Sequence, residues 1–398
     1  MLLSVLSLAI LALSGPDRIE LKDGKAHEGR VLAELKGSIV LREGRQVRTF
    51  SRADVVSVSS LERSLTKLLE SDLKSLDAGA LATLAGEADK AGLTADARNL
   101  WLRTLLADKD HVGARAALGA KPVKDDVTLH FGKSLLHLSH LRSGGLKWKE
   151  AYELPTTHFV LKTDLPLPAA LEAATALERF HHRFYGLLGE PLELYVFDER
   201  TLPEVRIYAE GASYPTPPRS GERVWFSMGE NCLHVAADGQ LALPSVVSEL
   251  SRQMLFSALR RSAGPTAQVQ PWISAGIAHY FGSIAPAQLD GTWGDADAAF
   301  AVAAKTVVGS KATFAALFNA PMDEFSNSAH ATEMSAVAWS ALHFFLYARD
   351  GALREGFGRY VNDGAKGKLS MSALCEHVRL KPDEIETLWR AHVAAAVR

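Results

Sequence analysis

The stretches "VVSELSRQML" (Val246–Leu255) and "PWISAGIAHYF" (Pro271–Phe281) decide how this chain is interpreted. In the first, apolar residues recur every three or four positions, which predicts a helix with one buried face. The second starts with a proline, which is favourable at the first position of a helix because its missing N–H is not needed there. Gly264 and Pro265 break the chain between them. The pattern therefore predicts two neighbouring helices joined by a short connection.

Four further stretches share one resemblance with this pair: "THFVLKTD" (157–164), "ALERFHHRFYGLLG" (176–189), "AVAWSALHFFLYARDG" (336–351) and "GFGRYVNDGAKGK" (356–368). Together they resemble the secreted bacterial peptidase-MA-like proteins, a gluzincin-related family of unassigned function. Such proteins carry His-Glu-x-x-His on one helix and Pro-Trp-x-x-Glu-Gly-x-Ala-x-Tyr-Phe on the next. The second motif matches at Pro271, Trp272, Gly276, Ala278, Tyr280 and Phe281, and the first only at Glu249. The resemblance covers roughly residues 151–398 and extends to the segments upstream.

The zinc ligands that the resemblance implies are replaced. Two histidines one helical turn apart and a glutamate from a second helix hold the zinc in gluzincins, and the glutamate of the first motif acts as general base. The corresponding ligand positions here are Ser248, Arg252 and Ala275. Serine is a poor zinc ligand, alanine has no donor atom, and Arg252 would place a permanent cation at the metal position. We therefore expect no metal ligand set in this motif and no zinc or other cofactor in the protein.

Glu249 and His279 are the candidate residues that remain. Glu249 lies three residues before Arg252, which predicts an ion pair on the helix surface. His279 lies one turn after Ala275 and could accompany Glu249 as an acid–base pair, hold a different metal, or simply be hydrogen-bonded in the former cleft. Trp272 and Tyr280 are expected to line that cleft.

Composition favours a globular protein without a strong charge. The 398 residues are 47% hydrophobic, and they include 44 basic and 46 acidic residues, which gives a net charge of -2. So small a net charge indicates no nucleic-acid partner and no anionic membrane partner. The apolar run Leu2–Leu13, followed by small residues and a proline, predicts a signal peptide over residues 1–14 and a secreted, periplasmic or cell-envelope location, although no Lys or Arg precedes it. A buried first strand or helix is the alternative. Cys232 and Cys375 are interpreted as two separate thiols, with one disulfide as the alternative.

The sequence of residues 17–119 predicts two small modules. Alternating residues around Asp23-Gly24 and Glu43-Gly44 predict hairpins, and residues 17–60 a small SH3-like or Sm-like β-barrel. Its basic residues are interpreted as a solvated face: Lys22, Lys25, Arg30, Arg42, Arg45, Arg48 and Arg52. Residues 61–119 predict amphipathic helices, broken at Gly92 and near Asp110, that are similar to one tetratricopeptide-like hairpin.

Residues 120–150 are expected to be a linker. His130, His137 and His140 lie there at spacings that would place them on one helix face, but packed or surface histidines are favoured over a metal site. From residue 151 an α+β segment is expected, followed by a mostly helical C-terminal half. Glu333, Trp339, His343 and Tyr347 fit a long helix packed beside the two motif helices, and one of His181 and His182 is expected to face solvent.

Three function classes follow from these observations. The first is a catalytically inactive gluzincin-like protein, a pseudopeptidase that holds a peptide or protein partner in the former substrate cleft. The second is a hydrolase with a non-standard site that uses Glu249 and His279. The third is an envelope-associated adaptor that works through the N-terminal modules.

Overall fold

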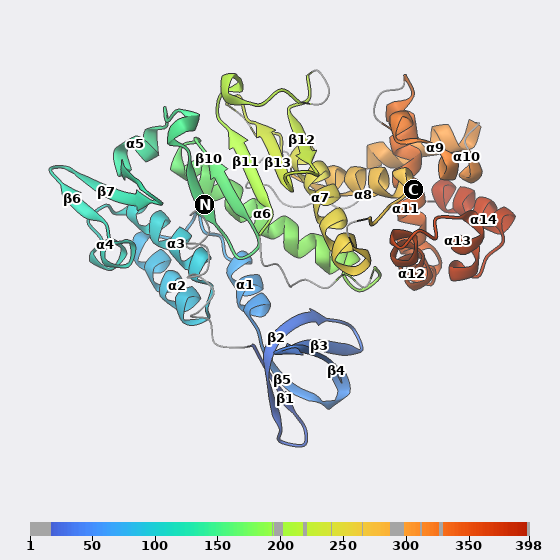
Figure 1. Ribbon diagram of the computed structural model, residues 1–398, viewed down its shortest axis with the longest axis horizontal. Coiled ribbons are helices and arrows are strands. Elements are labelled where there is room, and N and C mark those ends of the chain that lie inside the picture. Colours follow the sequence, from blue (N-terminus) through green and yellow to red (C-terminus); the bar gives the residue numbers. More distant parts are fainter. Residues whose placement is uncertain are drawn as a thin grey trace. The chain divides into compact units, whose positions relative to one another are not determined.

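The computed structural model describes residues 17–192, 194, 202–217, 221–239, 241–264, 266–286, 298–310, 313–325 and 329–395. The expected signal peptide lies outside them. Helices and strands both occur, so the fold is mixed α+β (Figure 1). The chain divides into two compact units, Met1–His182 with Val196–Tyr214 and Arg183–Tyr195 with Pro215–Arg398. The boundary expected near residue 151 therefore falls inside the first unit.

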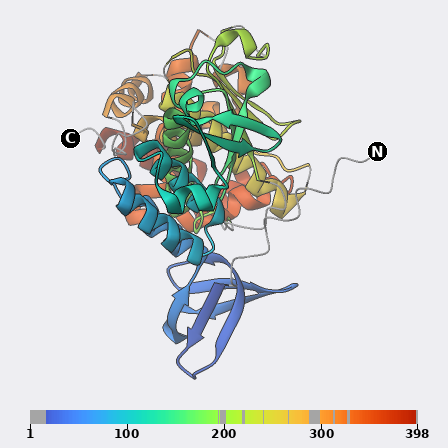
Figure 2. The ribbon, with the colours of Figure 1, turned by 90° about the vertical axis from the view of Figure 1, so that its left-hand side faces the viewer.

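The first unit begins with an antiparallel five-stranded sheet in the order β4-β3-β2-β1-β5. Its strands curve around one another in Figure 2 and are β1 (Asp17–Leu21), β2 (Ala26–Glu34), β3 (Ser38–Glu43), β4 (Gln46–Ser51) and β5 (Val55–Ser59). Gly24 and Gly44 have positive φ at the two predicted hairpin turns, which confirms both turns. Ile19, Val31, Ile39 and Leu41 form the sheet's own core.

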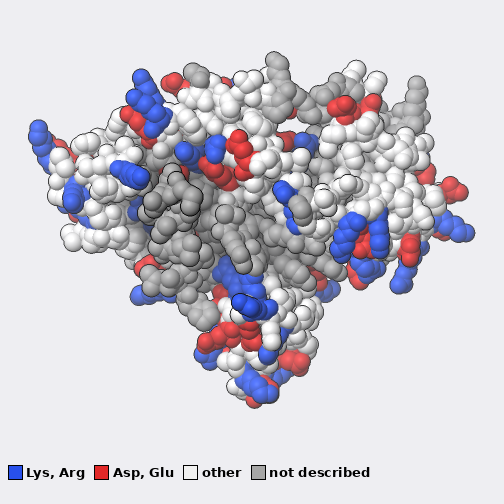
Figure 3. Space-filling model, in the orientation of Figure 1, with Lys and Arg blue, Asp and Glu red and all other residues white. Residues whose placement is uncertain are grey.

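The basic residues of this sheet lie among acidic ones on the face drawn in Figure 3. Glu34 pairs with Arg52 at 2.9 Å and with Arg63 at 2.7 Å, and Arg48 pairs with Glu43 at 2.9 Å. These pairs are consistent with a solvated face.

Four helices follow, as the periodicity predicts: α1 (Leu61–Leu69), α2 (Ala78–Lys90), α3 (Thr94–Ala107) and α4 (Val112–Leu118). Gly92 separates α2 from α3 with φ +83°, a conformation that favours glycine. The leucines and alanines of α1–α3 form one core cluster. Asp17 attaches α1 to the sheet, because its carboxylate accepts the N–H groups of Val31 at 2.8 Å and Leu61 at 2.9 Å.

Residues 120–150 contain a sheet where a linker was expected. Strands β6 (Lys121–Val123), β7 (Asp126–Phe131) and β8 (Ser134–His137) pair antiparallel, and helix α5 (Leu138–Ser143) follows. His130 thus lies on β7, His137 ends β8, and His140 is on α5. The three histidines do not share one helix face, because a hairpin turn at Gly132 separates the first from the other two.

Three further strands and a long helix complete the first unit. Strand β10 (Val160–Thr163) pairs antiparallel with β9 (Tyr152–Pro155) and parallel with β11 (Glu204–Tyr208). Helix α6 (Leu167–Leu188) contributes its residues up to His182 to this unit and the rest to the second. His181 is buried and His182 is exposed, as expected.

The second unit is mostly helical after one hairpin, β12 (Val224–Ser227) with β13 (Cys232–Ala236). Its helices are α7 (Leu243–Ala263), α8 (Pro271–Ile284), α9 (Ala298–Ser310), α10 (Phe314–Asn319), α11 (Ala331–Gly351), α12 (Arg354–Ala365), α13 (Met371–Val378) and α14 (Pro382–Ala395). Cys232 and Cys375 are both free thiols. Within the described residues, no helix combines the length and the apolar character needed to cross a membrane.

Candidate functional site

The two motif helices pack directly against each other. Pro244 lies in the first turn of α7 and Pro271 starts α8. A Cβ atom added to Gly282 of α8 would meet the hydroxyl of Ser248 on α7, so the two backbones approach closely at this point. The pair of helices predicted from the sequence is present, and Ser248 lies at its interface.

Glu249 and Arg252 form the predicted ion pair. The guanidinium Nη1 of Arg252 donates to Oε1 of Glu249 at 2.6 Å, and the two side chains are 23% and 22% exposed. The Nε atom of Arg252 is buried and has no hydrogen-bond partner among the residues that the structure describes. Arg252 is therefore held by a local ion pair along α7.

His279 lies within the electrostatic influence of that cation. Burial, and then the positive charge of Arg252, lower the pKa of His279 to about 4. The imidazole is consequently neutral at neutral pH, and it is a much weaker base than a general base working near pH 7 requires. Ala275, one turn earlier on α8, is fully buried.

Trp272 lies in the core of the second unit, which corrects its expected place in an open cleft. It is 0% exposed and packs against Phe314, Phe345 and Phe357. Tyr280 is 7% exposed, and its hydroxyl is 2.7 Å from that of Tyr347. Both aromatic residues of the motif thus contribute mainly to packing.

Helix α11 packs beside α8, as its aromatic residues indicate. A Cβ atom added to Gly276 would lie 2.7 Å from the carbonyl oxygen of Ala338 on α11. Farther along α11, Nδ1 of His343 lies 2.8 Å from Nε2 of His392. Burial, followed by the influence of His392, lowers the pKa of His343 to about 4.

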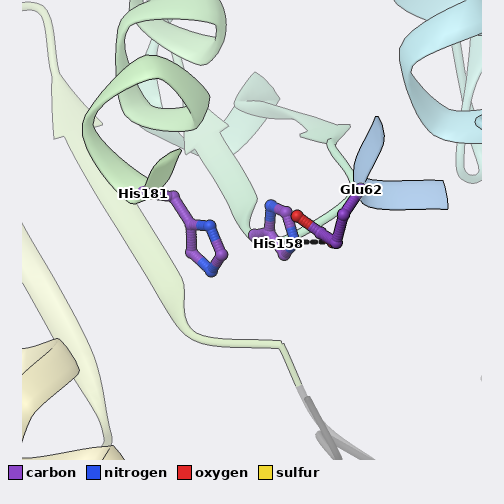
Figure 4. Close-up of side chains that lie close together, drawn as sticks. All are labelled: Glu62, His158 and His181. Carbon is purple, nitrogen blue, oxygen red and sulfur yellow. Dashed lines mark hydrogen bonds and ion pairs between the residues drawn. The ribbon is translucent and has the colours of Figure 1, made fainter. Parts of the chain in front are cut away.

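A second group of titratable residues lies in the first unit and was not found from the sequence. His158, in the loop before β10, is 2% exposed. Its Nδ1 is 2.5 Å from Oε2 of Glu178, whose other oxygen accepts the backbone N–H of His158 at 2.8 Å. Its Nε2 is 3.0 Å from Oε1 of Glu62, in the first turn of α1. Figure 4 shows His181 on one side of His158 and Glu62 on the other.

The charges in this group are strongly coupled. Burial alone would lower the pKa of His158, but the carboxylates of Glu178 and Glu62 outweigh it and raise this pKa to about 10. Nearby, burial and then the charge of Glu178 raise the pKa of Asp96 to about 7, although Asp96 accepts a hydrogen bond from Thr157 at 2.6 Å. His158 is therefore an imidazolium held between two carboxylates at neutral pH.

One signal for this group was present in the sequence. Glu178 and His181 are three residues apart, so they lie on the same face of α6. Their partners are far away in the chain, since 96 residues separate His158 from Glu62.

A further trio with donor atoms within 4.8 Å of one another, Glu230, Cys232 and His234, lies at the β12–β13 hairpin.

No protein-family model matches the chain, and no curated protein matches it.

Proposed function

We propose that this chain is a non-catalytic binding or scaffold protein built on a gluzincin-like helix pair. The observation that carries the proposal is the ion pair of Glu249 with Arg252, which puts a guanidinium where the related motif has a metal ligand. A bound zinc ion would face this cation at close range, and the two positive charges would repel each other. Zinc is accordingly not part of the proposal for α7 and α8.

The alternative, a hydrolase that uses Glu249 and His279, fits these residues less well. Glu249 is engaged by Arg252, and the pKa of His279 lies near 4. A general base is most effective when its pKa is close to the working pH, so neither group is poised to activate water at neutral pH.

The proposed partner is a peptide or protein segment that binds along α7 and α8. The Arg252 side chain is 23% exposed. A peptide carboxylate could bind the exposed part of its guanidinium, beside Glu249. In finer detail, the proposal includes an SH3-like or Sm-like barrel for β1–β5, a tetratricopeptide-like hairpin within α1–α4, and a gluzincin-like domain beyond them.

The test combines metal content with hydrolysis, using the full chain. Elemental analysis and a fluorogenic protein-hydrolysis assay are run on the parent and on Glu249→Gln and His279→Gln. Glu355→Gln is the matched control, since Glu355 also forms an ion pair along a helix, with Arg359. We expect no hydrolysis above background in any of the four proteins. Hydrolysis or bound metal that disappears in Glu249→Gln or His279→Gln, but remains in Glu355→Gln, would overturn the proposal.

The extracytoplasmic part of the proposal rests on the apolar run Leu2–Leu13 and has its own test. N-terminal sequencing of the protein from its native host should give a first residue near Gly15. A mature protein that retains Met1 contradicts this part and leaves the rest standing.

A further inference from the structure

Three donor side chains converge inside the first unit, away from the motif helices. Glu62 comes from α1, His158 from the loop before β10, and His181 from α6, and their donor atoms lie within 4.8 Å of one another (Figure 4). One carboxylate and two imidazoles are a set that zinc and similar ions accept. Residues from three separate elements thus offer one set of ligands.

His158 is held in the orientation that a metal ligand requires. Glu178 accepts hydrogen bonds from both Nδ1 and the backbone N–H of this residue, and its side chain is 1% exposed. A metal-binding histidine usually donates its second ring N–H to a carboxylate in this way, which fixes the tautomer and directs the other nitrogen to the metal. Nε2 of His158 accordingly faces Glu62.

The spacing between these two atoms already suits a shared ion. Nε2 of His158 and Oε1 of Glu62 are 3.0 Å apart. Two ligand atoms at about 2.0–2.2 Å from one tetrahedral zinc ion are separated by about 3.3–3.6 Å. A cation could thus replace the proton between them with only a small movement of either side chain.

The surrounding charge also favours a cation. Glu62 and Glu178 face one imidazole, and Asp96 lies close enough to interact electrostatically with both Glu178 and His158. The side chains of His158 and Glu178 are each 1% exposed, so solvent screens these charges weakly. A divalent ion would balance the two glutamates.

We propose that Glu62, His158 and His181 bind a divalent transition-metal ion, with Glu178 as the positioning residue of His158. Three protein ligands leave the fourth position of a tetrahedral ion to water or to another ligand, and the Glu62 side chain, 24% exposed, lies on the solvent side of the group. The site would connect the start of α1 to the loop before β10 and to α6. This inference departs from the expectation of a protein without metal, and it is independent of the proposed function.

One movement is needed to complete the site. The rings of His158 and His181 are stacked, with centroids 3.5 Å apart and planes 8° apart. A metal ion lies in the plane of each imidazole that binds it, so His181 must rotate out of the stack. Binding therefore changes the surroundings of the His181 ring, which is a measurable signature.

The experiment titrates zinc into the full chain after removal of bound metal with a chelator, using calorimetry. Cobalt is added in parallel, because its absorption spectrum reports imidazole and carboxylate ligands. We expect one zinc site with a Kd below about 1 µM. His181→Gln is the sharpest variant, since it removes one ligand and leaves the ion pairs of His158 in place. We expect it to weaken zinc binding at least about 100-fold, and Glu178→Gln to weaken it about 10–100-fold.

Three control variants separate this site from the others. His140→Gln changes an exposed histidine, Cys232→Ser changes the trio at the β12–β13 hairpin, and His279→Gln changes the motif helices. Zinc binding that survives these changes but is lost in His181→Gln supports the proposal. Binding that is lost in Cys232→Ser or His279→Gln instead, or an affinity in the parent weaker than about 1 µM, refutes it.

Discussion

Gly276→Ala is the substitution that tests the packing of α8 most directly. The added Cβ would lie 2.7 Å from the carbonyl oxygen of Ala338, and 3.2 Å from both its carbonyl carbon and Cβ of Leu342. The nearest two atoms belong to backbone, so no side-chain rotation relieves the contact and α8 and α11 must move apart. Overpacking of this kind costs about 1–3 kcal/mol, and we expect the upper end. Alanine recovers about 1 kcal/mol through its helix propensity, which leaves a net loss of about 2 kcal/mol.

The matched control is Gly186→Ala in α6. Gly186 is exposed, and an added Cβ there meets no atom within 4 Å. The same chemical change should therefore stabilise the protein by about 0.5–1 kcal/mol. Urea unfolding followed by far-UV circular dichroism measures both, with the slope against urea expected to stay constant. If Gly276→Ala were at least as stable as the parent while Gly186→Ala behaved as expected, the close approach of α8 and α11 would be wrong.

Two further predictions concern the second unit. The pKa values of His279 and His343 are lowered to about 4 in the folded chain. Between about pH 6.5 and pH 4 both imidazoles therefore stay neutral in the folded chain and become protonated in the unfolded chain. Their contribution to stability is complete above about pH 6.5 and is lost as the pH falls toward 4. We expect a loss of about 2 kcal/mol for each by pH 5. Urea unfolding of His279→Gln should show a smaller loss between pH 7 and pH 5 than the parent. The combined change Ser248→His, Arg252→His and Ala275→Glu should bind one more zinc equivalent than the parent in calorimetry. It should also lower the melting temperature, because residue 248 packs against α8 and Ala275 is fully buried. A folded variant with no additional zinc would show that the three positions do not face one point.

Local sequence signals predicted the elements well wherever one residue type dictates the backbone. Gly24, Gly44 and Gly92 mark turns with positive φ, and Pro271 marks the start of α8. Strand β11 and the β6–β8 sheet were missed. Strands β6 and β8 have only three and four residues, and the spacing of His130, His137 and His140 suggested a helix in the same segment.

The site was harder to predict for a different reason. The ion pair of Glu249 and Arg252 is local, and its spacing of three residues sufficed. The surroundings of His158 depend on contacts with residues 96 and 20 positions away, which only the tertiary structure brings together. Trp272 shows a related limit, because an apolar helix pattern indicates which residues are bulky but does not distinguish a core from the wall of a cleft.

The contact between Glu62 and His158 affects how this protein can be dissected. The sequence suggests that a fragment starting at residue 151 would be an independent domain. Such a fragment would keep the imidazolium of His158 and its partner Glu178 but lose Glu62. It would also expose the surface of α6 that α1 covers near Arg179, whose side chain donates to the carbonyl of Leu69 at 3.3 Å. The sequence boundary at residue 151 is therefore not a domain boundary of the folded protein. Fragments that start there should be poorly soluble unless they also contain α1.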